Sequence, residues 1–316
     1  MKSKKQLRAC LKIVVSICLV VWLAGKSDIR AIRETWQNFN ADYFLGVLTI
    51  VCLNIYLSTK RWQILVERFD QRPDFRQLLK YNCLSRFYNV YVPGNFAGDV
   101  IRGLTMHSKT MGQTQIMATV FMDRFIGLGC FLLIGAVGVL GAFPIFMRLH
   151  LIQSILLGAL IIGVCFIVLI NGWMVHWFKP AGSFHQKIME GIKTFLQYLS
   201  MYRHARGIIF MAGFLSILIA LNNVFVFYVT SLGIEAGVSL KYFLYFIPII
   251  NLLSYVPFTY SGLGVREGLM VYCFSAVGVS REVILSLSLL YFVWLIMMAT
   301  LSGGVSLLIP RQRAVQ

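Results

Sequence analysis

The chain has 316 residues, of which 58% are hydrophobic and 13% charged, and it carries a formal net charge of +17. A water-soluble domain of that composition would expose large apolar patches, so the sequence predicts an all-α integral membrane protein. A spanning helix needs about 20 mostly apolar residues, so the length allows about six to nine spans and leaves no room for a separate catalytic domain. We expect about seven to nine transmembrane or re-entrant helices. The basic residues stand in short blocks between apolar runs, as in cytoplasmic loops, and this excludes nucleic acid as the expected partner.

The cysteines and histidines form no ligand pattern. The seven cysteines are scattered, mostly inside apolar runs, without a CxxC pair, and the five histidines form no HExxH or HxH motif. Such cysteines are typical of small hydrophobic packing residues. We therefore expect no metal and no cofactor.

The N-terminal part sets the expected orientation. Residues 1–24 join a basic stretch to a short apolar run without a small-x-small cleavage site, which we interpret as a retained first span with a cytoplasmic N-terminus. Residues 26–42 are polar with balanced charges and fit an external loop. Residues 60–80 carry six Lys or Arg against three acids, which places them inside. The chain is thus expected to be a multi-pass protein of the cytoplasmic (inner) cell membrane.

The later apolar runs divide the chain into two halves. A single transmembrane domain is expected over residues 1–316, with a first half at about 43–178 and a second half at 207–309. Residues 179–206 have an amphipathic middle and are expected to form an interfacial cytoplasmic helix between the halves. The spans are expected at residues 43–65, 116–143, 151–178, 207–232, 242–256 and 283–309.

Two segments, 78–106 and 255–277, are apolar enough to enter the membrane but are broken by proline, glycine and charge. The first contains YVPGNFAGDVIR at residues 91–102, and the second contains YVPFTYSGLGVR at residues 255–266. Both read Tyr-Val-Pro, four residues, Gly, three residues, Arg. One such segment per half indicates an internal duplication and two pseudo-symmetric halves.

The composition of these segments predicts helix breaks that line a cavity. Proline removes a backbone donor and interrupts a helix, and glycine permits a tight backbone. Backbone groups freed in hydrocarbon must be satisfied by protein or by water, so corresponding broken helices in two halves indicate a transporter's central site. The predicted break residues are Pro93, Gly94, Gly98, Pro257, Gly262 and Gly264.

Charged residues lie within or near the breaks. A charge near the bilayer centre costs about 2.5–3.5 kcal/mol on insertion scales, so it normally faces a partner or a wet cavity. Asp123 and Arg124 are adjacent, point about 100° apart on a helix, and cannot simply neutralise each other. The candidate headgroup-binding residues are Asp99, Arg102, Asp123, Arg124, Arg266 and Glu267.

Structural roles remain open for these charges. Asp99 and Arg102, three positions apart, also fit a local helix pair at the cytoplasmic interface. Glu267, beside Arg266 at the start of an apolar run, also fits a contact with a helix N-terminus. The glycines of residues 127–141 are expected to serve helix packing.

The motifs PGNFAGDVIRG, TVFMDRFIGL and NLLSYVPFTYSGLGVREGL resemble the transmembrane, flippase-like region of the lysylphosphatidylglycerol synthases. The similarity covers residues 10–309, and the chain is identified as a stand-alone member of this family. The soluble aminoacyl-transferase domain of the lysyl-transferring enzymes does not follow residue 309. The resemblance therefore implies lipid translocation and not lipid aminoacylation. The family's motif positions fall on Pro93, Gly94, Gly98, Asp99, Arg102, Asp123, Arg124, Gly262, Gly264, Arg266 and Glu267.

The first functional hypothesis is a lipid translocase that moves a phosphate-bearing polar lipid through the cavity between the two breaks. Guanidinium groups suit phosphate because they grip it in a bidentate way. The carboxylates would hold the arginines when the site is empty, or bind a cationic headgroup. The expected partners are membrane lipids with an anionic phospholipid or lipid-linked headgroup. A homo-oligomer is left open.

Two alternatives stand beside it. One is a membrane transferase acting on a phospholipid or lipid-linked sugar, for which Asp99 and Asp123 are the candidate base or metal carboxylates. The other is a membrane partner of a separately encoded lipid synthase. The translocase is preferred over the enzyme because the loops contain no DxD-like metal pair and no nucleotide-binding motif.

Overall fold

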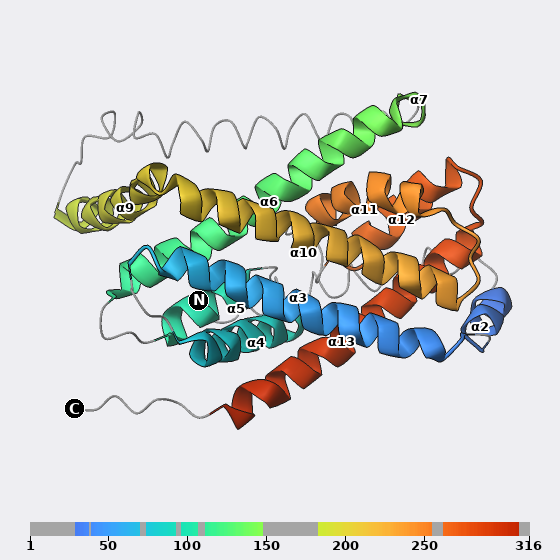
Figure 1. The fold of residues 1–316 in the computed structure, drawn as a ribbon, viewed down its shortest axis with the longest axis horizontal. Helices are drawn as coiled ribbons and strands as arrows, with labels where there is room; N and C mark the ends of the chain where they lie inside the picture. The colour runs from blue at the N-terminus through green and yellow to red at the C-terminus, as the bar shows by residue number, and fades with distance from the viewer. Residues whose placement is uncertain are drawn as a thin grey trace.

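The structure, a computed structural model, describes residues 29–37, 39–69, 74–92, 96–106, 111–147, 183–254 and 262–309, and these residues contain helices but no strand. Four of the helices are long and apolar enough to cross a membrane (Figure 1). They are α3 (Asp42–Val66), α6 (Gln113–Gly141), α10 (Arg206–Gly233) and α13 (Arg281–Leu308). The all-α membrane class and these four predicted spans are confirmed. The spans expected within residues 1–24 and at 151–178 lie outside the described residues.

Both predicted helix breaks are present. In the first half α4 (Phe75–Tyr91) ends before α5 (Ala97–Thr105) begins, and in the second half α11 (Leu240–Ser254) ends before α12 (Val265–Ser275) begins. The 15 residues of α11 extend about 22 Å, which is less than the hydrocarbon thickness of about 30 Å. Pro93, Gly94 and Pro257 lie outside the described residues.

The two halves run in opposite directions and pair through α3 and α10, which lie side by side (Figure 1). The N–H of Asn40, just before α3, donates to the carbonyl of Gly233 at the end of α10 at 2.9 Å. At the opposite end of the pair, Arg61 of α3 donates to Ser216 of α10. The helices are therefore antiparallel, as in inverted repeats related by a pseudo-twofold axis in the membrane plane.

The two halves also pack against each other through two equivalent pairs of helices. The helix before each break packs against the long helix after the break of the other half, α4 on α13 and α11 on α6. Tyr91 of α4 bonds to Thr300 of α13 at 2.7 Å between the hydroxyls. On α6, a Cβ at Gly138 would lie 2.8 Å from the carbonyl oxygen of Tyr245 of α11. This close approach confirms the packing role expected for this glycine.

The remaining described helices sit at the ends of the bundle. The linker predicted at residues 179–206 forms α9 (Ser183–Met201) and the 3₁₀ turn η2 (Tyr202–His204). The hydroxyl of Tyr202 donates to the carbonyl of Leu65 at 2.7 Å, and burial raises its pKa, so it stays a neutral donor. At the other end of the bundle, the predicted external loop at 26–42 instead contains α2 (Ile29–Gln37), which contacts α13. The short helix α7 (Phe143–Phe146) follows α6.

Candidate functional site

A cavity of about 320 Å³ lies inside the bundle and is lined by residues from α3, α4, α5, α6, α10, α11, α12 and α13. Its volume is at the lower end of the range for ligand sites. At about 30 Å³ per molecule it has room for on the order of ten waters. Residues from both halves of the chain thus line one space able to hold a hydrated polar group.

The cavity wall is rich in arginine. Arg102 follows the first break, on α5, and Arg266 follows the second break, on α12; their exposed fractions are only 2% and 3%. Each guanidinium lies against an aromatic ring, Arg102 at 4.6 Å from the Trp62 ring centroid and Arg266 at 4.7 Å from that of Tyr291. The arginines that line the cavity are Arg61, Arg86, Arg102, Arg124 and Arg266.

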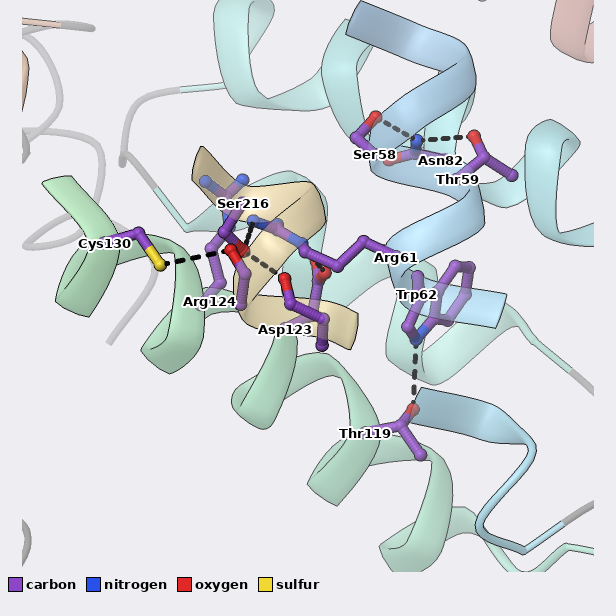
Figure 2. A network of polar contacts seen from close by, with 12 residues as sticks. Ser58, Thr59, Arg61, Trp62, Asn82, Thr119, Asp123, Arg124, Cys130 and Ser216 are labelled. Carbon is purple, nitrogen blue, oxygen red and sulfur yellow. Dashed lines mark hydrogen bonds and ion pairs between the residues drawn. The ribbon is translucent and has the colours of Figure 1, made fainter. Parts of the chain in front are cut away.

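Asp123 of α6 is the centre of a buried polar network that reaches from the first half to α10 (Figure 2). Its Oδ1 accepts from Nε of Arg61 and its Oδ2 from Nη2 of Arg102, both at 2.7 Å. Nη1 of Arg61 also donates to Oγ of Ser216 at 3.0 Å. One buried carboxylate and two guanidinium groups therefore tie α3, α5, α6 and α10 together.

Asp99 holds the other arginine of this network. Nε of Arg124 lies 2.6 Å from its Oδ2, and Nη2 of Arg102 lies 3.3 Å from its Oδ1. Ser85 of α4 donates to the same Oδ1 at 3.2 Å. The local pair of Asp99 with Arg102 exists but is buried, and the adjacent Asp123 and Arg124 take different partners, as their positions on a helix predicted.

The second-half site is simpler. Nη2 of Arg266 lies 2.8 Å from Oε1 of Glu267, and this oxygen also accepts from the hydroxyl of Ser288 on α13 at 2.9 Å. Oε2 of Glu267 accepts from the N–H of Gly264 at 2.5 Å. Glu267 therefore accepts from a backbone N–H at the start of α12, as the alternative of a contact with a helix N-terminus allowed. It also pairs with Arg266.

Gly98, Gly262 and Gly264 lie beside the breaks. They were predicted to line the cavity, but they are not among the described residues that line it; their backbone conformation and packing require glycine instead. Gly262 and Gly264 have φ of +77° and +86°, in the region where residues with a Cβ are strained. At Gly98, a Cβ would lie 1.9 Å from the carbonyl oxygen of Ser85. The backbones of α4 and α5 are therefore in direct contact at the first break.

Two of the lining arginines, Arg61 and Arg86, were not predicted as site residues. Arg61 stands within the basic stretch of residues 60–80, and Arg86 lies within the first broken segment but outside its repeated motif. Nη2 of Arg86 donates to Oδ1 of Asn54 at 2.8 Å and to Oγ of Ser58 at 2.9 Å. A set of asparagines that line the cavity was not predicted either. Their position within apolar runs could have indicated them, because polar side chains there normally face a cavity. These amides are Asn54, Asn82, Asn89, Asn223 and Asn251.

Positive side chains predominate on the cavity wall. Five arginines line it, and among the described residues that line it the one carboxylate is Asp123. An anion that enters the cavity therefore meets mainly guanidinium groups. Among the described residues no group of three His, Cys, Asp or Glu side chains is arranged to hold a metal ion.

These features define a class: a multi-pass helical membrane protein with two antiparallel halves that enclose an arginine-lined polar cavity. The model of the lysylphosphatidylglycerol synthase transmembrane region matches residues 10–303, and the chain belongs to this family. The chain is also similar to a UPF0104 membrane protein of Methanothermobacter thermautotrophicus, with 23% identity over 305 residues, 88% of this chain and 85% of that protein. No solved structure matches the chain.

Proposed function

We propose that the protein is a lipid translocase that moves a phosphate-bearing polar lipid between leaflets through the arginine-lined cavity. The observation that carries the proposal is that five arginines from both halves line one space inside the helix bundle. The family supports a role in the membrane and is compatible with this function.

The cavity addresses the main energetic barrier to lipid translocation. An idealised estimate for moving a small ion from water into a medium of low dielectric constant is about 20 kcal/mol. Guanidinium groups replace the lost hydration well, because they form bidentate bonds to phosphate and are more weakly hydrated than ammonium groups. The acyl tails stay in lipid, so only the headgroup needs this path.

The carboxylates act as counterions of the empty site. Asp123 is shared by Arg61 and Arg102, and Asp99 by Arg102 and Arg124. A phosphate that enters the cavity offers these arginines a second set of acceptor oxygens. Headgroup binding can then proceed by rearranging existing ion pairs rather than by assembling a site anew.

The charge at the two ends of the bundle supports the orientation proposed for the cytoplasmic membrane. Among the described residues, basic residues outnumber the acids Glu67 and Asp74 at the end that holds η2 and the start of α10, whereas the end that holds α2 and the start of α13 carries both signs in similar number. By the positive-inside rule the first end faces the cytoplasm. The basic residues described at that end are Arg68, Arg76, Lys80, Lys193, Arg203 and Arg206.

Reconstitution tests the proposal. Purified protein in proteoliposomes is expected to accelerate the exchange of a tail-labelled anionic phospholipid between leaflets, measured by chemical quenching of the outer label. Arg102→Ala and Arg266→Ala should each abolish the acceleration, and Arg203→Ala, at an exposed position, should not. Wild-type rates in both cavity variants would refute the assignment, and a chemically new lipid would favour a transferase.

A further inference from the structure

Arg86 of α4 lines the cavity together with the arginines that follow the two breaks, Arg102 and Arg266. Resting on the proposed function, we infer that Arg86 is a substrate-contacting residue that receives the headgroup phosphate on its way between those two arginines. The phosphate thus moves in short steps from one donor to the next.

The first arginine subsite lies at the level of Ser216 on α10. Oγ of Ser216 accepts from Nη1 of Arg61 at 3.0 Å, and Asp123 accepts from both Arg61 and Arg102 at 2.7 Å. Figure 2 shows Arg61 between Ser216 and Asp123. A phosphate held by Arg61 and Arg102 is therefore close to this point of α10.

The second arginine subsite lies further along α10, at the level of Phe227. The rings of Phe227 and Tyr291 are stacked with 4.0 Å between their centroids, and the guanidinium of Arg266 lies 4.7 Å from the Tyr291 ring. The distance from Ser216 to Phe227 along the helix axis is about 16 Å. A phosphate that crosses this interval inside the protein needs polar partners, because an ion without them is costly there.

Arg86 supplies a partner within this interval. Its Nη2 donates to Oδ1 of Asn54 at 2.8 Å and to Oγ of Ser58 at 2.9 Å. Nδ2 of Asn54 in turn lies 3.5 Å from the carbonyl oxygen of Ile219 on α10. The guanidinium of Arg86 is thus held near the level of Ile219, about 5 Å along α10 from the level of Ser216.

Two amides supply donors in the rest of the interval. Nδ2 of Asn251 on α11 donates to Oδ1 of Asn223 on α10 at 3.0 Å, and both residues line the cavity. Asn223 lies about 6 Å along α10 from Ile219 and about 6 Å from Phe227. An amide carries two N–H donors, so this one bond leaves further donors for a phosphate oxygen. Donors therefore follow one another in steps of about 5–6 Å between the two subsites.

The contacts of Arg86 suit a residue that both binds and releases a phosphate. Asn54 and Ser58 orient its guanidinium at the cavity wall, and both are neutral acceptors. An ionised phosphate forms stronger hydrogen bonds to a guanidinium than neutral acceptors do. It can therefore take their place on Arg86 and leave them to rebind when it moves on.

The experiment separates the positive charge of Arg86 from its hydrogen bonds. Arg86→Gln keeps an N–H donor and removes the charge, whereas Arg86→Lys keeps the charge. In proteoliposomes with tail-labelled phosphatidylglycerol, Arg86→Gln should slow exchange at least about tenfold, and Arg86→Lys should stay within about threefold of the wild-type rate, because hydrogen bonds to charged groups are the stronger ones.

Binding of a water-soluble lipid shows whether the site itself is intact. Dihexanoyl phosphatidylglycerol should bind to purified Arg86→Gln in detergent within about threefold of its wild-type affinity, because both arginine subsites at the breaks remain. Arg76→Gln is the matched control: Arg76 is exposed on the same helix, so the loss of its charge should leave exchange and binding unchanged. A melting temperature measured for each variant reports folding.

The outcomes separate this inference from the proposed function. If the wild-type protein exchanges no lipid faster than empty vesicles, the translocase function itself fails. If it does exchange lipid and Arg86→Gln is as fast, translocation stands and the role of Arg86 is overturned. Equal slowing in Arg86→Gln and Arg86→Lys overturns it as well, because the charge is then not used. Loss of dihexanoyl phosphatidylglycerol binding in Arg86→Gln would make Arg86 part of the initial binding site or of the fold, and would also overturn the inference.

Discussion

Arg102 and Arg266 occupy equivalent positions after the two helix breaks, and both side chains reach the same cavity. Each is buried against an aromatic ring and paired with a carboxylate on its own half. Their partners differ, since Arg102 is held by Asp123 of the following long helix and Arg266 by the adjacent Glu267. The duplication therefore provides two arginine subsites with unequal surroundings in one space.

Removal of Asp123 should destabilise the fold. Asp123→Leu leaves Arg61 without the carboxylate that it pairs with and takes one of the two from Arg102. Breaking a buried ion pair by removing one partner costs about 3–5 kcal/mol in the free energy of unfolding. Thermal unfolding of the purified variant in detergent measures this loss.

The double variant Arg61→Leu/Asp123→Leu should recover part of that stability, because it removes a buried charge together with its partner. Asp42→Leu, at an exposed position in the first turn of α3, is the control and should cost less than about 1 kcal/mol. Equal effects of Asp123→Leu and Asp42→Leu would contradict the network.

A methyl group at Gly98 should separate α4 from α5. The added Cβ would lie 1.9 Å from the Ser85 carbonyl oxygen, so the backbones must move apart at the first break. We expect Gly98→Ala to lower the free energy of unfolding by about 1–3 kcal/mol, the range for overpacking. Gly129→Ala on α6, where a Cβ meets nothing within 4 Å, should be neutral or stabilising by up to about 1 kcal/mol. A melting temperature unchanged in Gly98→Ala would show that this contact is not tight.

Gly264 should be intolerant of a side chain for a different reason. Its φ of +86° strains any residue with a Cβ by about 1–2 kcal/mol, and its N–H is the donor to Glu267. Gly264→Ala should therefore lower both stability and the translocation rate, because the bond that holds Glu267 beside Arg266 is disturbed. Gly268→Ala, four residues later in α12 in open space, is the matched control. The comparison of melting temperature and exchange rate in the two variants tests this.

The two ends of the bundle should be accessible from opposite sides of the membrane. Gly237 and Arg203 are exposed and lie beyond opposite ends of α10. A cysteine at Gly237 should react with a membrane-impermeant maleimide added outside intact cells, and a cysteine at Arg203 only after permeabilisation. Both are scored against the unsubstituted protein, which carries native cysteines. The reverse pattern would invert the proposed orientation.

Much of the fold was predictable because lipid imposes simple requirements on a sequence. A long apolar run must satisfy its own backbone hydrogen bonds and becomes a helix, so α3, α6, α10 and α13 followed from composition. The breaks after α4 and α11 followed from proline and glycine in duplicated motifs. Six charged site candidates were found in the same way, because charges within apolar segments are costly and therefore informative; their role in headgroup binding stays a prediction.

The sequence by itself determined that this protein lies in lipid, that it is helical, which family it belongs to and that it contains a duplicated motif. Each of these depends on local composition or on a motif. Only the tertiary structure decided that the halves are antiparallel and interlocked, that Asp123 joins Arg61 to Arg102, and that Arg86 and the asparagines share the cavity with them. Those relationships depend on which helix faces pack together. Packing is set by the summed contacts of residues far apart in the chain, which no single segment records.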